Sequence, residues 1–214
     1  MAVLEDVDIA QGIPPRLEFE HLIWSKGYAN IAGIDEAGCG PLAGPVVAAA
    51  AVFPAYFYIP DIRDSKKLSA RQRETFFPQI IESALSYGIG IVHHQEVDRI
   101  NIRQATFKAM KMALGSLKLK PDYLLIDGYE LPNSIYQQEA VVDGDDHCFT
   151  IAAASILAKV TRDRLMVDYH AQYPQYGFDR HKGYGTKLHR EMIKKYGPCP
   201  IHRQTFIRKI VESG

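Results

Sequence analysis

Short apolar runs bounded by turn-forming residues recur along the chain and predict five β-strands. Each run has the length of a strand and is rich in Ile, Val, Leu, Phe or Tyr, residues that favour strands. Four glycine or proline residues stand between the first two runs, so we expect those two strands to form an antiparallel hairpin. The predicted strands cover residues 31–35, 45–53, 88–93, 123–127 and 139–142.

Apolar residues at helical spacing fill the segments between the later strands. In the long helix, Thr150 is the predicted N-cap, just before a run of Ile and Ala. The alternation of helices and strands after an opening hairpin indicates an α/β fold, with a mixed β-sheet flanked by helices. The predicted helices cover residues 70–87, 102–117, about 150–169, 187–196 and 205–211.

The spacing of proline and glycine divides the chain into three segments of one compact unit. We assign residues 1–27 to a polar N-terminal arm and residues 28–172 to the core that contains the predicted sheet. Glycine and proline recur after Tyr173 and interrupt any long element, so residues 173–214 are predicted to form a small helical lobe packed on the sheet.

The composition is that of an ordinary soluble globular protein. Of the 214 residues, 47% are hydrophobic and 23% are charged, and no run approaches the length of a membrane span. The N-terminus lacks the basic and apolar regions of a signal peptide. Cys39, Cys148 and Cys199 form no CxxC pair, which argues against disulfides and zinc and favours a reducing compartment. We therefore expect a cytoplasmic protein.

Charge is distributed unevenly although the formal net charge is zero. From residue 171 onward nine Lys or Arg residues face three Asp or Glu residues, a balance of +6, which leaves −6 for the first 170 residues. A basic end beside an acidic body suits a protein that binds a polyanion with one part and a metal with the other. A solvated basic helix would give the same count, so the charge alone leaves both interpretations open.

Acidic residues follow three of the predicted strands. Asp35 and Glu36 end the first, Asp127 ends the strand at 123–127, and Asp145 follows the last strand and precedes the long helix. If the first and fourth strands are parallel neighbours, Asp35 and Asp127 emerge at the same edge. Four carboxylates brought together need a cation, and an all-oxygen ligand set favours Mg²⁺ or Mn²⁺. Taken singly, each acid is more simply explained as a turn or helix cap.

Several further residues are candidates for contact with nucleic acid. The backbone of the glycine-rich turn after Glu36 can approach a substrate closely. Basic residues lie before the first long helix, and a polar stripe at i, i+4 and i+7 marks the 150–169 helix. A tyrosine in the segment 180–187 can stack on a sugar or base. The alternative is that all of these groups are solvated surface. The candidates are Gly38, Cys39, Gly40, Lys66, Lys67, Ser155, Lys159, Arg162 and Tyr184.

Five motifs in one order resemble those of type 2 ribonuclease H, the bacterial ribonuclease HII group. The chain carries GIDEAG at 33–38 with GPLAGPV at 40–46, DSKKLS at 64–69, IDG at 126–128, IAAASILAKVTRD at 151–163 and HKGYGT at 181–186. The resemblance covers most of the chain from residue 31 to residue 206. It implies an RNase H-like fold and a metal-dependent endonuclease that cuts the RNA strand of RNA–DNA hybrids. Such enzymes also cut 5′ of a single ribonucleotide in duplex DNA, leaving a 3′-hydroxyl and a 5′-phosphate.

The resemblance also implies roles for individual residues. Asp35, Glu36 and Asp127 would bind metal with Asp145 as the fourth acid, and the Gly38–Gly40 backbone with Tyr184 would recognise the ribose 2′-hydroxyl. The chain departs from the family at two positions. Cys39 replaces the usual arginine, which removes a possible guanidinium contact to phosphate. Asp143 stands where a lysine is common, which adds negative charge near the acids.

Three alternatives remain beside a monomeric hybrid nuclease without a membrane partner. A ribonuclease HIII-like enzyme would carry an additional N-terminal domain, for which the residues before Ile31 are too few. A non-catalytic module that binds hybrid duplex would need the basic lobe and Tyr184 but not the acids. A nucleotide switch ranks last because the chain has no GxxxxGK[ST] loop.

Overall fold

A five-stranded mixed sheet forms the centre of the molecule in the computed structural model, which describes residues 13–212. The strand order is β3-β2-β1-β4-β5; β1 pairs antiparallel with β2 and parallel with β4. The predicted hairpin and the predicted parallel neighbours are therefore confirmed. The strands are β1 (Ile31–Ala37), β2 (Val46–Val52), β3 (Ser86–Val92), β4 (Tyr123–Asp127) and β5 (Gln137–Val141).

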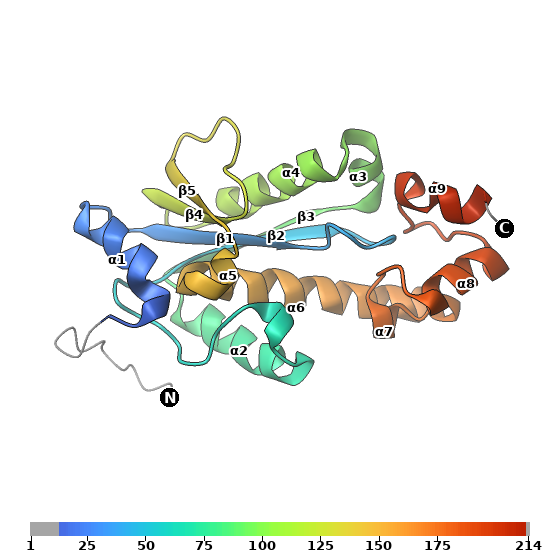
Figure 1. Cartoon of the computed structure of the whole chain (residues 1–214), viewed down its shortest axis with the longest axis horizontal. Helices are drawn as coiled ribbons and strands as arrows, with labels where there is room; N and C mark the ends of the chain where they lie inside the picture. The colour runs from blue at the N-terminus through green and yellow to red at the C-terminus, as the bar shows by residue number, and fades with distance from the viewer. Residues whose placement is uncertain (1–12, 213–214) are drawn as a thin grey trace.

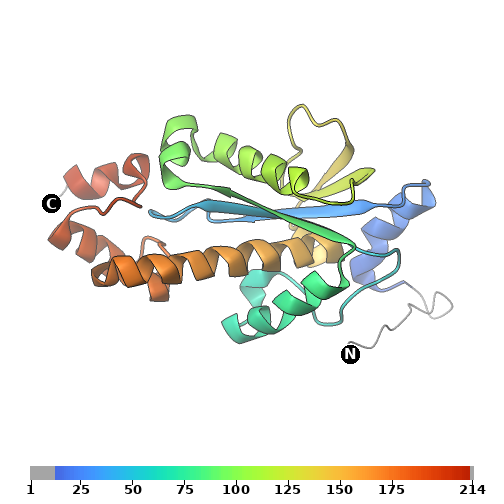
Figure 2. The same cartoon turned by 180° about the vertical axis from the view of Figure 1, so that it is seen from behind.

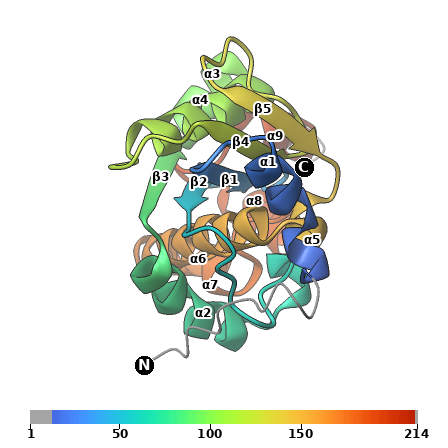
Figure 3. The ribbon, with the colours of Figure 1, turned by 90° about the vertical axis from the view of Figure 1, so that its left-hand side faces the viewer.

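Helices cover both faces of the sheet and both of its ends. The helices α2 and α6 lie on one face and α3 and α4 on the other (Figures 1 and 3), while α1 lies at one end and α7–α9 at the opposite end (Figures 1 and 2). The helices are α1 (Glu18–Ser25), α2 (Ala70–Ser83), α3 (His94–Ile100), α4 (Ile102–Gly115), α5 (Gly144–His147), α6 (Phe149–Gln172), α7 (Phe178–His181), α8 (Lys187–Tyr196) and α9 (Gln204–Glu212). Short 3₁₀ helices are η2 (Pro15–Leu17), η3 (Ser65–Lys67) and η4 (Pro174–Tyr176).

The structure corrects two details of the predicted elements. The helix predicted over 70–87 ends at Ser83, because Ser86 already pairs with Val52 in the sheet. The helix α3 was not predicted. Residues 1–12 of the predicted N-terminal arm lie outside the described part of the chain.

Thr150 is not the N-cap of the long helix. The helix α6 begins at Phe149 with Cys148 at the N-cap, and the Thr150 side chain lies one position inside the helix. The backbone N–H and the hydroxyl of Thr150 both donate to Glu20 Oε1 at 2.9 Å. Burial raises the pKa of Glu20 to about 7. A fully buried acid of α1 therefore caps the helix that the threonine was predicted to cap.

The helix α6 lies unusually close to β1, and the sequence of β1 allows it. A Cβ atom added to Gly33 would lie 2.1 Å from the backbone carbon of Thr150 and 2.4 Å from the nitrogen of Ile151. Only a residue without a side chain fits at that distance. The start of α6 is thereby fixed against the middle of the central strand.

On the opposite face of the sheet, glycines likewise allow a helix to lie close to a strand. Cβ atoms added to Gly88 and Gly90 of β3 would lie 2.1 and 2.0 Å from the carbonyl oxygens of Ala113 and Ala109 in α4. Between these contacts β2 has the sequence VVAAAAV and is buried along its whole length. Small side chains on both faces of β2 let α6 and α4 pack on it closely, with an apolar core on either side.

The last three helices have an apolar core of their own, which reaches into the loop after β1. Backbone hydrogen bonds join Leu42 N–H to Gly183 O and Gly44 N–H to Ile201 O, both at 2.9 Å. The buried residues of this third core are Leu42, Ala43, Met166, Tyr176, Phe178, Ile193, Cys199, Ile201, Ile207 and Ile210.

In the described residues, we find no helix with the length and apolar character of a membrane span.

We predict that Gly33→Ala lowers the stability of the fold by about 3 kcal/mol or more, because the new methyl group must displace helix backbone. This corresponds to a fall in Tm of roughly 6–12 °C for a chain of this size. The matched control is Gly115→Ala at the exposed end of α4, where nothing lies within 4 Å of the added Cβ, so Tm should stay constant or rise slightly. Thermal unfolding followed by circular dichroism measures both. An unchanged Tm for Gly33→Ala would show that α6 can move away from β1.

Candidate active site

Asp35 and Asp127 end adjacent strands at the same edge of the sheet. Ile34 of β1 pairs with Ile126 of β4 in parallel register, so the acids that follow them lie level with each other. The Asp35 side chain is buried, and its Oδ1 accepts a hydrogen bond from the N–H of Glu36 at 2.6 Å. The adjacent Glu36 is partly buried. The predicted convergence of the strand-end acids is confirmed for this pair.

Asp145 reaches the same edge through a short connection from β5. The N–H of Gly144 donates to Asp127 Oδ1 at 2.8 Å, which ties the start of α5 to the end of β4. Asp145 is the next residue, and its side chain is buried. Asp143 adopts a left-handed conformation just before α5 and is exposed; its negative charge contributes to raising the pKa of Asp127.

Burial and neighbouring negative charges raise the proton affinity of the four acids. Burial is the largest cause in each case; for Asp35 the negative charges of Glu36 and Asp127 come next, and its pKa lies well above the usual range. The pKa values of Glu36 and Asp127 are also raised, and that of Asp145 is raised to about 6. Carboxylates that are desolvated and repel one another bind protons more tightly, and a bound cation would favour their ionised form. This all-oxygen donor set fits Mg²⁺ or Mn²⁺.

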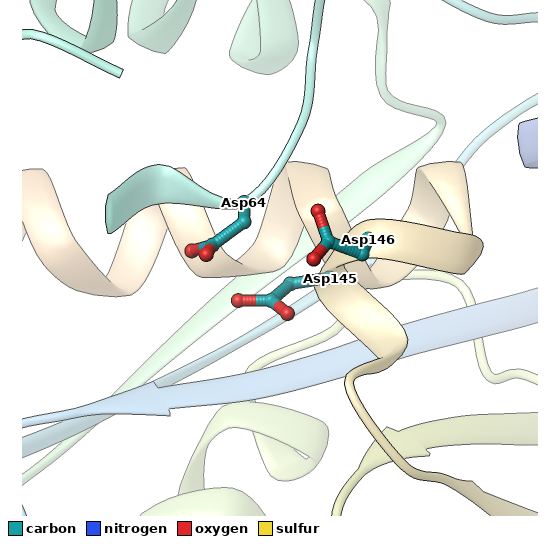
Figure 4. Close-up of side chains that lie close together, drawn as sticks. All are labelled: Asp64, Asp145 and Asp146. Carbon is teal, nitrogen blue, oxygen red and sulfur yellow. The ribbon is translucent and has the colours of Figure 1, made fainter. Parts of the chain in front are cut away.

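A second group of acids lies beside Asp145 and is balanced by lysines. Figure 4 shows the side chains of Asp64, Asp145 and Asp146 next to one another, and their oxygen atoms lie within 4.8 Å. Lys66 Nζ lies 3.4 Å from Asp145 Oδ2, and Lys67 pairs with Asp146. The carboxylate of Asp64 accepts the N–H of Lys66 at 2.8 Å and caps η3.

These contacts join η3 to α5. Sequence analysis selected the two lysines of this segment and missed Asp64, although Asp64 begins the same DSKK motif. The structure places both lysines on the acids of α5, and their contact with substrate stays a prediction.

Buried arginines hold the backbone of the loop that follows β1. Arg203 donates to the carbonyl oxygens of Gly38 at 2.6 Å, Cys39 at 3.1 Å and Gly44 at 3.0 Å. Arg162 donates to those of Ala43, Pro45 and Lys182 at 3.2, 3.0 and 3.0 Å. Both side chains are fully buried. Carbonyl groups are acceptors and cannot pair with one another. Those of this glycine-rich loop therefore accept hydrogen bonds from buried guanidinium groups.

The predicted polar stripe on α6 is not a surface stripe. Ser155 is buried with its Oγ 2.8 Å from Ser65 Oγ, and a hydrogen bond from the Ser155 hydroxyl lowers the pKa of Asp35. Lys159 pairs with Asp163 at 2.6 Å. Arg162 is covered by the loop that it holds, so its predicted contact with phosphate is wrong, and it acts as a positioning residue. The i, i+4, i+7 spacing was correct, but the loops pack over that face of α6.

Tyr184 lies beside the Gly38–Gly40 loop, as a shared role in recognition requires. A Cβ atom added to Gly40 would lie 4.0 Å from Tyr184 Cε1. The tyrosine is 43% exposed, with Lys159 Nζ and the Arg162 guanidinium 5.9 and 5.8 Å from the centre of its ring. The structure therefore brings two distant predicted segments together.

Two buried histidines, His189 and His202, connect the backbone of Tyr184 to that of Cys199, and sequence analysis missed them. Cys199 N–H donates to His202 Nδ1 at 2.9 Å, so the ring proton of His202 is on Nε2. His202 Nε2 donates to His189 Nε2 at 3.0 Å, which leaves His189 Nδ1–H to donate to Tyr184 O at 2.9 Å. Burial lowers the pKa of both rings to about 4, consistent with this neutral chain. Isolated histidines in a basic segment give no sequence signal of such a pairing.

Cys39 faces an acid and a threonine. Its Sγ donates to Glu36 Oε1 at 3.4 Å and lies 3.2 Å from Thr106 Oγ1. Burial and the charge of Glu36 raise the pKa of the thiol to about 12, so the side chain is neutral. The thiol supports Glu36 and adds no positive charge at this position.

The family model described as Ribonuclease HII matches residues 32–209 of this chain. The chain belongs to the ribonuclease HII family. A ribonuclease HII of Caldanaerobacter subterraneus is 53% identical over 194 residues, which cover 91% of this chain and 80% of the relative. The chain is accordingly a ribonuclease H, an endonuclease that hydrolyses phosphodiesters.

Solved structures agree with that assignment and confirm the predicted RNase H-like fold. The crystal structure of ribonuclease H2 from Pyrococcus horikoshii has a TM-score of 0.72 and 29% identity, and the match covers 86% of this chain and 98% of that chain. The crystal structure of Bst-RNase HIII in complex with Mn²⁺ has a TM-score of 0.68 at 17% identity, covering 94% of this chain and 73% of that chain. The latter likeness concerns the fold.

We predict that divalent cations stabilise this ribonuclease HII more strongly as the pH rises. The folded-state pKa values of the four acids are raised, that of Asp145 to about 6, so their ionisation as the pH rises destabilises the metal-free fold, and a bound cation offsets that loss. The difference in Tm between Mg²⁺ and EDTA should grow from near zero around pH 5 to about 5–10 °C around pH 8. Differential scanning calorimetry over this range measures it.

Asp145→Asn should reduce the Tm difference, whereas Asp168→Asn, at an exposed acid of α6, should leave it unchanged. A metal-induced shift independent of pH would contradict a cation site made of these carboxylates.

Proposed function

We propose that this ribonuclease HII is a metal-dependent endonuclease that cuts the RNA strand of RNA–DNA hybrids and cuts 5′ of single ribonucleotides in duplex DNA. The cut leaves a 3′-hydroxyl and a 5′-phosphate. One observation carries the proposal: acids at the ends of adjacent strands, Asp35 and Asp127, lie at the edge where the Gly38–Gly40 loop and Tyr184 also meet. Hydrolytic groups and groups able to read a ribose thus occupy one surface.

The acids Asp35, Glu36, Asp127 and Asp145 would hold Mn²⁺ or Mg²⁺. Bound there, the cations would supply Lewis-acid chemistry, which activates a water molecule and stabilises the leaving oxygen. A Mn²⁺ complex of the structurally similar Bst-RNase HIII supports the choice of ion. Asp35 is rigidly placed by the N–H of Glu36 and Asp127 by the N–H of Gly144, so the carboxylates are pre-oriented.

The remaining residues bind and orient the substrate. Lys66 keeps its positive charge, because the charges of Asp145, Asp35 and Asp64 raise its pKa despite partial burial, which lowers it. It balances part of the negative charge that would otherwise repel the phosphodiester. The backbone of Gly38–Gly40 and the hydroxyl of Tyr184 would read the 2′-hydroxyl, which distinguishes RNA from DNA.

The partner that we propose is a hybrid or a ribonucleotide-containing duplex, bound by one copy of the protein in the cytoplasm. The three cysteines are free thiols, as in a reducing compartment. The basic residues of the C-terminal segment would add long-range attraction to the phosphates.

We predict that wild-type protein cleaves duplex DNA with one ribonucleotide in Mg²⁺ or Mn²⁺ and not in EDTA, and that Asp127→Asn lowers kcat by at least about 100-fold. Loss of a ligand removes several kcal/mol of stabilisation of the transition state. Binding of the duplex, followed by fluorescence anisotropy, should change less than about threefold. Labelled strands resolved on a denaturing gel report the site and rate of cutting.

Asp168→Asn serves as the control acid and should cleave at the wild-type rate. If Asp127→Asn kept the full rate, the assignment of the acids would be wrong. Binding without cleavage by wild-type protein under any cation would favour the non-catalytic binding module.

We further predict that Tyr184→Phe lowers kcat/KM on a single embedded ribonucleotide by about 3–10-fold, the worth of one hydrogen bond. The ring and its packing remain, so only the hydroxyl contact is lost. Tyr196→Phe, at a similarly exposed tyrosine of α8, is the matched control and should have no effect. Equal rates for Tyr184→Phe and wild type would remove Tyr184 from recognition of the ribose.

A further inference from the structure

A cavity of about 340 Å³ adjoins the acids and is not used by the mechanism above. One wall consists of Glu36, Cys39 and Asp127, and the other is formed by α4 and by Tyr129, which follows β4. Because two of the proposed metal ligands line it, whatever fills the cavity lies next to the scissile bond.

Arg103 supplies the positive charge of this cavity. It is the sole Lys or Arg among the described residues that line it, and the neighbouring thiol of Cys39 is neutral. Within residues 13–212 its guanidinium makes no hydrogen bond or ion pair. By contrast, Arg99 and Lys108 on the neighbouring turns both pair with Glu96. The N–H groups of Arg103 are thus available to an anion.

Aromatic rings hold this guanidinium in place. Its central carbon lies 5.0 Å from the centre of the Tyr129 ring and 5.8 Å from that of Phe107, distances at which cation–π attraction operates. Phe107 is buried in the wall of the cavity, whereas Tyr129 is 67% exposed. A positioned arginine presents its donors to a phosphate at lower entropic cost than a mobile one.

The backbone places Tyr129 next to the acids at the end of β4. Gly128, with φ of +75°, lies between Tyr129 and the catalytic Asp127, and such a conformation is strained for residues with a side chain. The turn directs the chain away from β4 directly after the acid. An exposed tyrosine has an apolar ring with a polar tip, which suits contact with a sugar.

We propose that this cavity is a subsite for a nucleotide flanking the cleaved bond, in which Arg103 binds the phosphate and Tyr129 packs against the sugar. The inference rests on the proposed function. Phosphate and sugar account for most hydrogen bonds between proteins and nucleic acids, and arginine and tyrosine are common donors to them. Successive nucleotides are close along a strand, so a polymer held at the acids must place a neighbour near this cavity.

The test compares Arg103→Ala, Arg103→Lys and the control Arg99→Ala on duplex DNA with one ribonucleotide. Arg103→Ala should raise KM about 5–10-fold with kcat within twofold, and should reduce the slope of log KM against log[salt] by about 0.9, the change for one phosphate contact. Arg103→Lys should retain most of the affinity, and Arg99→Ala should match wild type. Tyr129→Ala should raise KM without changing the salt slope.

Substrates of decreasing length identify the contact. The cleaved strand is shortened one nucleotide at a time from either end, and the effect of Arg103→Ala should vanish in one series when the contacted phosphate is removed. An unchanged KM and salt slope for Arg103→Ala, or an equal change for Arg99→Ala, would overturn the subsite. If wild-type protein did not cleave the duplex at all, the proposed function would fail instead, so the two failures are distinguishable. Circular dichroism melts confirm that each variant is folded.

Discussion

The close approach of α6 to β1 determines the geometry of the rest of the molecule. Gly33 allows the start of the helix to lie against the middle of the central strand, and from there α6 runs as one rigid element along the sheet. Ser155 consequently lies beside Asp35 and Ser65, and Arg162, two turns further, lies beneath the loop that follows β1. A shift of α6 would therefore displace both the acids and the loop that follows β1. A glycine in a strand, usually a weakness, is here the condition for an active site.

The acids are held together against electrostatic repulsion by contacts that do not neutralise them fully. Backbone N–H groups of Glu36 and Gly144 fix Asp35 and Asp127, and Lys66 balances part of the charge at Asp145. Their pKa values are still raised, chiefly because burial disfavours the charged form, so these contacts do not fully compensate the loss of solvation. Unfavourable electrostatics maintained by a rigid scaffold are typical of functional sites. The neighbouring acids Asp64 and Asp146 differ because Lys66 and Lys67 pair with them, and these contacts attach η3 to α5.

The sequence predicted what depends on local pattern and failed where a contact joins distant segments. Apolar runs and turns predicted the strands and the hairpin, whereas the convergence of Asp35 with Asp127 depended on the assumption that the first and fourth strands are parallel neighbours, which the structure confirms. The pattern could not show that loops cover one face of α6, so Arg162 was taken for a phosphate contact. The pairing of His189 with His202 likewise depends on the packing of two segments. Thr150 has a good N-cap side chain, yet Glu20 of α1 performs the capping, a choice that only tertiary structure decides.

The Gly38–Gly40 loop, Tyr184 and the segment around Arg203 are joined by buried polar side chains rather than by apolar packing alone. Arg203, from the C-terminal segment, binds carbonyl oxygens of Gly38 and Cys39, while Arg162 reaches Lys182 just before Tyr184. His189 and His202 then hold the carbonyl of Tyr184. A glycine-rich loop has few side chains with which to pack, so its position must be fixed through its backbone, and a buried guanidinium is well suited because its donors have a fixed geometry. Residues 189–203 therefore fix the positions of the Gly38–Gly40 loop and of Tyr184 through buried hydrogen bonds, and so hold both beside the acids.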